Sequence, residues 1–339
     1  MKLSPRDCFV CCALALVSLG GCGGGDKVEY KDLRDPDPHV RTDAAQRLGQ
    51  AKAVEAVDSL LAGLDDPDEV VRVTVVRALG QIGDSRAVPA LLETLEDPLR
   101  SVRMAACQSL GQIGDPEALP GLVTMLYQED DNLRLTATAS IGKIEGAESL
   151  ELLLTMALRD DNEWVRRQAI KVVQERGARE AIPHLEQALA GEADAVRANA
   201  AQALGVLGDR SSVPVLVAAL DDPFFKVRSL SAHALFALAP DDDGVRQAIK
   251  ARAEIEENQM SRVDLAWNLA RLGDDQGLEV LRLYLFRGDP EDVRAEAAMA
   301  LGEVGDQSDI PLLQKAAADK KGLVREQALW AIEKLKKAA

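Results

Sequence analysis

The apolar residues of this chain follow a helical period inside a short unit that recurs along the sequence. The unit at residues 66–95 shows the pattern most plainly. One face of its predicted first helix carries five apolar residues at helical spacing: Val71, Val75, Val76, Leu79 and Ile82. A second apolar segment comes next, with its buried face predicted at Leu91, Leu92 and Leu95. Each unit is therefore predicted to be a pair of helices joined by two short turns.

Polar and special residues predict where these helices begin and end. Asp66 is expected to cap the first helix, with Pro67 at its first helical position. Gly83 is expected to end that helix, because glycine is the common residue at a helix C-terminus. Asp84 then caps the next turn, and Pro89 opens the second helix. The connections between the two helices are therefore only a few residues long.

One arginine, usually preceded by valine, marks the same place in every unit and is called the unit arginine below. Its positions recur every 31 to 34 residues: Arg41, Arg72, Arg103, Arg134, Arg166, Arg197, Arg228, Arg262, Arg294 and Arg325. A period this regular over nearly the whole chain indicates a repeat architecture rather than one globular core. Nine units are followed by a second helix, and the tenth ends on its first helix. A short helix over residues 28–33 is expected to precede the first unit.

Two further positions in each unit predict how neighbouring units pack. Three residues after the unit arginine stand mostly small residues: Ala44, Val75, Ala106, Ala137, Ala169, Ala200, Ser231, Leu265, Ala297 and Ala328. Seven residues after it stand large aliphatic residues: Leu48, Leu79, Leu110, Ile141, Val173, Leu204, Leu235, Leu269, Leu301 and Ile332. No single helix pair can bury both sets, so stacked units must share one continuous core.

The unit pattern of Asp-Pro, Val-Arg, Ala, Leu-Gly-x-Ile-Gly-Asp and Ala-x-Pro-x-Leu resembles the short HEAT-like repeats of phycobilin lyases and deoxyhypusine hydroxylase. The resemblance covers residues 26–339 and implies an all-α fold, an α-solenoid (superhelix) of about ten HEAT-type helical pairs. Residues 128–146 and 239–262 depart from the pattern. The longest step in the repeat, 34 residues, falls in the second of these segments, where we expect a local bend or hinge.

The N-terminal segment resembles a bacterial lipoprotein signal peptide. Lys2 and Arg6 precede an apolar run over residues 9–19, which is too short to span a bilayer. The run ends in Leu-Gly-Gly followed by Cys22, an order similar to a lipobox. The resemblance implies residues 1–21 as the signal peptide, lipidation at Cys22, and residues 22–25 as the lipidated cysteine with a glycine linker. An ordinary secretory signal with an incidental cysteine is the alternative.

These features predict an exported protein that is lipid-anchored to a bacterial membrane. The residue directly after the cysteine is Gly23. This residue favours a location at the outer membrane, facing the periplasm, if the host has an outer membrane. Of the five cysteines, Cys107 alone would remain free once the signal is removed and Cys22 is acylated, so no intrachain disulfide is expected. Cys107 falls in a core position and is expected to be buried.

Charge and residue usage narrow the function classes. Lys and Arg total 40 and Asp and Glu total 56, a net charge of −16. Nucleic-acid binding needs a basic surface, so no nucleic-acid ligand is expected. The resemblance to the hydroxylase would imply His-Glu pairs that ligate iron, but His39, His184 and His233 are not followed by Glu. We expect scattered surface histidines, no catalytic residue, no metal and no cofactor.

Acidic pairs recur at the turns between units: Asp65-Asp66, Glu96-Asp97, Asp130-Asp131, Asp160-Asp161 and Asp221-Asp222. They are interpreted as helix caps that also aid solubility. A row of acids that docks a basic partner or weakly binds Ca²⁺ is the alternative.

Aromatic and methionine residues mark the surfaces where a partner protein could bind. Trp267, Met299 and Trp330 stand five residues after their unit arginines, where a polar outward face is expected. Trp164, Phe224 and Phe225 stand near the starts of first helices. Exposed Trp, Phe and Met are typical interface residues. For Trp267, Met299 and Trp330 the alternative is contact with flanking helices or, for Trp330, a terminal cap.

The sequence therefore predicts a non-catalytic, membrane-anchored, protein-binding scaffold or adaptor of the bacterial cell envelope. The alternative is a phycobilin lyase-like or hydroxylase-like enzyme, or an enzyme accessory, built on HEAT repeats. The partner and the oligomeric state are not predicted.

Overall fold

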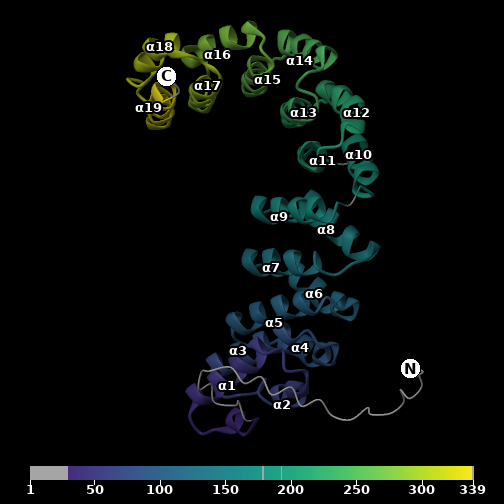
Figure 1. The fold of residues 1–339 in the computed structure, drawn as a ribbon. Helices are drawn as coiled ribbons and strands as arrows, with labels where there is room; N and C mark the ends of the chain where they lie inside the picture. Colours follow the sequence, from purple (N-terminus) through teal and green to yellow (C-terminus); the bar gives the residue numbers. More distant parts are fainter. Residues whose placement is uncertain (1–29, 178, 192, 338–339) are drawn as a thin grey trace, which may run out of the picture.

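The computed structural model describes residues 30–177, 179–191 and 193–337, and its helices stack into a curved superhelix (Figure 1). Helices account for all the regular secondary structure in this part of the chain. The prediction of an α-solenoid is confirmed. Ten first helices carry the unit arginines: α1 (Pro38–Gln50), α3 (Glu69–Ile82), α5 (Arg100–Ile113), α7 (Asp131–Ile141), α9 (Glu163–Glu175), α11 (Asp194–Leu207), α13 (Phe225–Leu238), α15 (Gln259–Arg271), α17 (Glu291–Val304) and α19 (Gly322–Lys337).

Nine second helices alternate with them, as predicted: α2 (Val57–Leu61), α4 (Val88–Thr94), α6 (Leu119–Leu126), α8 (Ala147–Arg159), α10 (Ala181–Gly191), α12 (Val213–Ala218), α14 (Asp243–Ile255), α16 (Asp275–Arg287) and α18 (Ile310–Ala316). Short 3-10 helices complete several turns: η1 (Tyr30–Arg34), η2 (Val54–Ala56), η3 (Ser85–Ala87), η4 (Pro116–Ala118), η5 (Arg210–Ser212), η6 (Ala219–Asp221) and η7 (Gln307–Asp309). The element η1 lies where a leading helix was expected.

The two kinds of helix line opposite sides of the arc. In Figure 1, α13, α15 and α17 lie on its inner side, whereas α12, α14 and α16 lie on its outer side. Every residue predicted to be buried at the third and seventh positions after a unit arginine is buried in the structure. Burying one such leucine stabilises the fold by about 2 kcal/mol. The stacked apolar positions therefore form the continuous core that the repeat predicts.

The helix boundaries confirm most of the expected caps and correct one. Gly83 ends α3 with a φ of 78°, a left-handed conformation that glycine adopts without strain. Asp84 caps η3, and Pro89 lies in the first turn of α4. The prediction for Asp66 and Pro67 was wrong, because the residue that caps α3 is Asp68, whose carboxylate accepts hydrogen bonds from the backbone N–H groups of Val70 and Val71.

Adjacent first helices approach closely at a glycine that stands eight residues after the unit arginine. A Cβ atom at these positions would lie within 3.0 Å of an atom in the next unit: Gly49, Gly80, Gly111, Gly142, Gly205 and Gly302. At Gly205 the obstructing atoms are the Cα and Cβ of Ala234, both 2.8 Å away. The glycine thus sets the spacing between first helices, a role additional to the helix stops predicted from sequence.

Between α13 and α15, Phe236 stands in place of that glycine, as Gln174 does in α9 and Ala270 does in α15. Within α15 the apolar core divides into two clusters, since Leu265 and Leu269 belong to the N-terminal cluster and Val263 belongs to the C-terminal one. Figure 1 shows the stack turning in this region, between α11 and α15. The bend therefore lies next to the 34-residue step, as expected; mobility at this place stays a prediction.

We expect Gly205→Ala to lower the free energy of unfolding by about 1–2 kcal/mol, because forcing the backbones of α11 and α13 apart outweighs the higher helix propensity of alanine. Urea denaturation followed by circular dichroism measures the change. The control is Gly191→Ala, since no atom lies within 4 Å of a Cβ atom at Gly191. Equal stability of the two variants would show that glycine does not set the helix spacing.

Candidate functional site

Most unit arginines hold the turn that precedes their own helix, through hydrogen bonds to its carbonyl oxygens. In the third unit, for example, Nη1 of Arg103 donates to the carbonyl oxygens of Asp97 and Pro98, at 2.8 and 3.0 Å. Arg72 makes the same pair of bonds to Asp66 and Pro67. These carbonyl groups would otherwise have no backbone partner, so the arginine satisfies the turn and fixes its shape.

Six unit arginines also bind a carboxylate in the turn of the next unit, through Nε–O distances of 2.6 to 3.0 Å. The pairs are Arg41–Asp66, Arg72–Asp97, Arg134–Asp160, Arg197–Asp222, Arg228–Glu256 and Arg294–Asp319. Together with the bonds to the carbonyl groups, these pairs join consecutive turns along one edge of the stack. We call this series the arginine ladder.

The ladder explains the acidic pairs at the turns. Asp66, Asp97, Asp160 and Asp222 are bound by arginines of the preceding unit, whereas their neighbours Asp65, Glu96, Asp161 and Asp221 are exposed. Burial raises the pKa of the Asp66 carboxyl, but hydrogen bonds from Arg41 and from the backbone of Asp68, together with the charges of Arg41 and Arg72, outweigh burial and the net pKa is lowered. One acid of each of these pairs therefore serves unit packing, a role that neither the capping nor the docking interpretation included.

The ladder is interrupted at Arg103, Arg166 and Arg262. Near Arg103, the guanidinium of Arg100 binds Asp130 of the next turn instead. Nη1 of Arg262 lies 3.4 Å from the hydroxyl of Tyr284. Within the described residues no carboxylate binds Arg166, and its buried Nε has no hydrogen-bond partner. Arg166 is therefore oriented like the other unit arginines but lacks their anionic partner.

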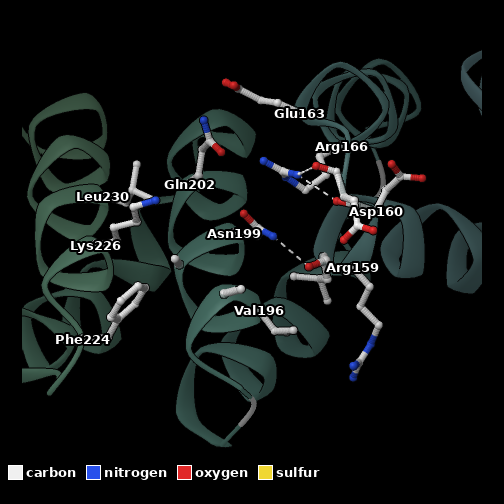
Figure 2. Close-up of a pocket in the computed structure, with 14 residues that line it drawn as sticks. Arg159, Asp160, Glu163, Arg166, Val196, Asn199, Gln202, Phe224, Lys226 and Leu230 are labelled. Carbon is white, nitrogen blue, oxygen red and sulfur yellow. Dashed lines mark hydrogen bonds between the residues drawn. The ribbon is translucent and has the colours of Figure 1, made fainter. Parts of the chain in front are cut away.

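A groove of about 600 Å³ lies beside Arg166, where the first helices α9, α11 and α13 begin (Figure 2). Its walls come from four helices and one turn: Leu158, Arg159, Asp160, Asp161, Glu163, Arg166, Ala195, Val196, Ala198, Asn199, Gln202, Phe224, Lys226 and Leu230. Figure 2 shows Arg166 on the α9 side, Asn199 and Gln202 on α11 in the middle, and Phe224 on the α13 side. The groove thus spans three consecutive units.

Polar groups in the groove differ in whether they are already engaged. Asp160 is bound by Arg134, and Glu163 forms an ion pair of 2.6 Å with Arg167. Nδ2 of Asn199 donates to the carbonyl oxygen of Leu158 at 2.8 Å, which fixes the orientation of the amide (Figure 2). Two of the carboxylates in the groove, Asp160 and Glu163, are therefore neutralised by ion pairs with arginines of this chain. Among the described residues, the guanidinium of Arg166 has carbonyl partners for Nη1 and no partner for Nε.

The structure brings only some of the predicted interface residues together. Phe224 lines the groove, and Phe225 packs edge-on against it with ring centroids 5.3 Å apart. Trp164 stands on α9 two residues before Arg166; it is 70% exposed, and the guanidinium of Arg167 lies 5.7 Å from its ring centroid. These three aromatic residues lie in and beside the same three units as the groove.

Trp267, Met299 and Trp330 lie on α15, α17 and α19, beyond the helices that form the groove. Trp330 is 40% exposed and Nζ of Lys334 lies over its ring. Met299 and Trp267 are half-buried. The ring of Trp267 packs edge-on against His233 of the neighbouring α13 and lies near Arg271 of its own helix, a contact of the kind given as the alternative.

A half-buried polar cluster that the sequence did not predict surrounds Trp267 between α13, α15 and α17. Nδ2 of Asn268 lies 3.2 Å from Nδ1 of His233 and donates to the carbonyl oxygen of Asp264 at 2.8 Å. Burial lowers the pKa of His233 and raises those of Asp264 and Glu296 to about 6 each. Phe236 in place of glycine is the sequence signal that could have indicated an altered inner face here.

The expectation of scattered surface histidines holds for His39 and His184, which are exposed, but was wrong for His233. The described residues contain no group of three or more His, Cys, Asp and Glu side chains that could hold a metal ion. Cys107 is free and buried, as predicted, and burial raises the pKa of its thiol to about 12. Its thiol therefore stays protonated and unreactive at neutral pH.

The prediction for Cys22, including the signal peptide and the linker, lies outside the described residues. Among the helices that are described, none has both the length and the apolar character that a membrane span requires.

Comparison with known proteins identifies the repeat. Four overlapping matches to the sequence model of HEAT repeats cover residues 57–141, 119–197, 185–269 and 248–333. A search of curated protein sequences finds no match.

Three solved structures illustrate the range of similar folds. The karyopherin Kap121p, bound to the extreme C-terminus of the protein phosphatase Cdc14p, is 14% identical with a TM-score of 0.59, over 91% of this chain and 42% of Kap121p. Human deoxyhypusine hydroxylase is 24% identical with a TM-score of 0.33, over 72% and 94% of the two chains. The CpcE–CpcF complex of phycocyanin lyase from Nostoc is 18% identical with a TM-score of 0.29, over 95% and 99%. The first likeness shows the fold alone, and the other two are too distant to bear on activity.

We expect Asp264→Asn to raise the free energy of unfolding by about 2 kcal/mol at pH 8, with the gain vanishing towards pH 4. The folded-state pKa of Asp264, about 6, exceeds the unfolded value, so its ionisation destabilises the folded state above pH 6 and not below pH 4. His233 of α13 and Glu296 of α17 titrate in the same cluster, and Glu303 of α17 lies close enough for its charge to act on both, so urea denaturation should compare the two proteins at each pH.

Asp65→Asn is the control, because Asp65 is exposed. If Asp264→Asn changed stability equally at pH 8 and pH 4.5, the pKa of Asp264 would not be raised in the folded protein.

Proposed function

This chain belongs to the HEAT-repeat family, and on that premise we propose that it is a non-catalytic scaffold that binds a protein partner at the bacterial cell envelope. HEAT-repeat solenoids typically bind proteins, because stacked helix pairs present a long, continuous surface. The karyopherin with a similar fold was crystallised with a segment of another protein. Neither fact identifies the partner of this chain.

The groove beside Arg166 is the observation that carries the proposal. It spans three units and combines an unpaired arginine, two amide side chains and a half-buried phenylalanine. Such a mixture of apolar contacts and a few fixed polar groups is typical of a surface that recognises an extended protein segment. Trp164 and Phe225, next to the groove, enlarge the apolar area available to a partner. No observation favours the lyase or hydroxylase alternative.

The membrane anchor is the second part of the proposal, and it depends on the sequence alone. Lipidation of Cys22 would leave three glycines, Gly23 to Gly25, between the acyl chains and the repeats. Three extended residues span about 10 Å. The first unit would then lie at the membrane, and the groove, which α9 to α13 form, would lie several units away from it. An anchored scaffold of this kind would hold its partner near the membrane surface.

A photo-crosslinking amino acid at Gln202, in the middle of the groove, is expected to capture the partner in intact cells. Position Gln187, which is exposed on α10 and does not line the groove, is the matched control. Mass spectrometry should find a protein that is crosslinked from Gln202 and absent from Gln187. Identical products from both positions, or none from Gln202, would contradict binding in the groove.

Separately, we expect the membrane fraction to contain the native protein with an acylated Cys22, and Cys22→Ser to move the protein out of that fraction. Mass spectrometry of the N-terminal peptide measures the added lipid. Retention of the serine variant in the membrane fraction would refute the anchor while leaving the groove proposal unaffected.

A further inference from the structure

We propose that Arg166 is the receptor for a carboxylate group of the partner, presented by an extended segment that lies in the groove. The inference rests on the proposed function and adds the chemistry that the groove recognises. Its basis is a difference between Arg166 and the other unit arginines of the same chain.

Six equivalent arginines bind a carboxylate that stands 25 to 28 residues later in the sequence. Four of these six carboxylates stand 25 residues later, as in Arg41–Asp66 and Arg197–Asp222. Twenty-five residues after Arg166 stands Gly191, which has no side chain, and the next residue, Glu192, lies outside the described residues. Within the described residues, the unit that follows Arg166 therefore lacks the acid that an ordinary unit supplies.

The guanidinium of Arg166 already has the orientation that the paired arginines show. Its Nη1 donates to the carbonyl oxygens of Asp160 and Asp161 at 2.8 and 2.9 Å (Figure 2). The paired Arg72 and Arg228 bind their own turns in the same way. A carboxylate that arrives at Arg166 thus meets a donor group that is already held in place, which reduces the entropy lost on binding.

An acceptor is also required for the buried Nε of Arg166, which has no partner. A guanidinium presents its N–H groups as a planar fork that matches the two oxygens of a carboxylate. Among the nearby acids, Asp160 pairs with Arg134 and Glu163 pairs with Arg167. Asp161 contacts Arg166 through its backbone carbonyl oxygen. An external carboxylate is the group whose charge and geometry fit the position.

The other interruptions of the ladder do not offer the same site. At Arg103, the neighbouring Arg100 binds the acid of the next turn. Arg262 has an unpartnered Nε, but the hydroxyl of Tyr284 lies beside its Nη1 and Arg262 does not line the groove. Arg166 combines the vacant position with an open groove. Phe224, at the other side, would contact an apolar residue of the same segment (Figure 2).

The decisive variant is Gly191→Asp, which supplies the missing acid from the chain itself. A Cβ atom at Gly191 meets nothing within 4 Å, so the fold has room for the side chain. The probes are peptides selected from a random dodecapeptide display library on the wild-type protein. They are then synthesised with a blocked N-terminus and with the C-terminus either amidated or free. Each form is measured by fluorescence anisotropy against wild type, Gly191→Asp, Arg166→Gln and the control Gly191→Ala.

Selected peptides are expected to contain Asp or Glu and to lose at least tenfold in affinity when that residue becomes Asn or Gln. Gly191→Asp and Arg166→Gln should each cause a similar loss, whereas Gly191→Ala should stay within twofold of wild type. Peptides that need a free C-terminus instead, and that Gly191→Asp also weakens, would assign the terminal carboxylate as the group bound.

Peptides that bind wild type and Gly191→Asp equally, or a library without any carboxylate-dependent binder, would overturn the inference. Glu192, which comes directly after Gly191 in the sequence, is tested in parallel as Glu192→Gln. If peptides bound only to Glu192→Gln, Glu192 would be the partner of Arg166 in the free protein. That result would also overturn the inference. Crosslinks from Gln202 that persist in Gly191→Asp would leave the proposed function standing without this receptor.

Discussion

The bond between a unit arginine and the next turn is the interaction on which the stack depends. In a solenoid each unit contacts only its neighbours, so no distant part of the chain can correct an error in their relative position. The guanidinium joins two carbonyl groups of its own turn to a carboxylate of the next, as Arg72 joins Asp66 and Asp97. Apolar contacts are not directional, and this ion pair supplies the orientation that they lack.

The glycine contacts set the distance between first helices, and one of the junctions without the glycine lies at the bend of the stack. Phe236 replaces the glycine between α13 and α15, and the buried pair Arg228–Glu256 lies in the same junction. Burial opposes ionisation of Glu256, but hydrogen bonds from Arg228 and from the backbone of Asn258 outweigh it and hold the pKa at about 2. A buried ion pair adds little net stability, but it restricts how the two units can pack.

The repeat, the buried positions and most of the helix ends could be predicted because they depend on residues close together in the sequence. The role of Asp66 could not, because its partner Arg41 stands 25 residues earlier and capping by Asp66 is an equally good local explanation. The same limit applies to His233, whose burial depends on Trp267 in the following unit.

The candidate site was predicted only in part. Phe224, Phe225 and Trp164 could be predicted because aromatic residues are rare in this chain and these three stand near helix starts. The groove itself depends on α9, α11 and α13 together, and no single unit encodes it. Arg166 looks ordinary in the sequence, because its repeat motif is intact. The missing carboxylate partner becomes apparent only when the contacts of Arg166 are compared with those of the equivalent arginines.

The absence of a side chain at Gly191 indicates one way in which repeat proteins can acquire new binding sites. Duplication of a unit copies both the arginine and its acid, so every new unit begins with a satisfied pair. Losing the acid in one copy exposes a preoriented cation while the neighbouring pairs keep the stack assembled. A repeat array can thus acquire a recognition site by deletion of a single functional group, without evolving a new residue to make the contact.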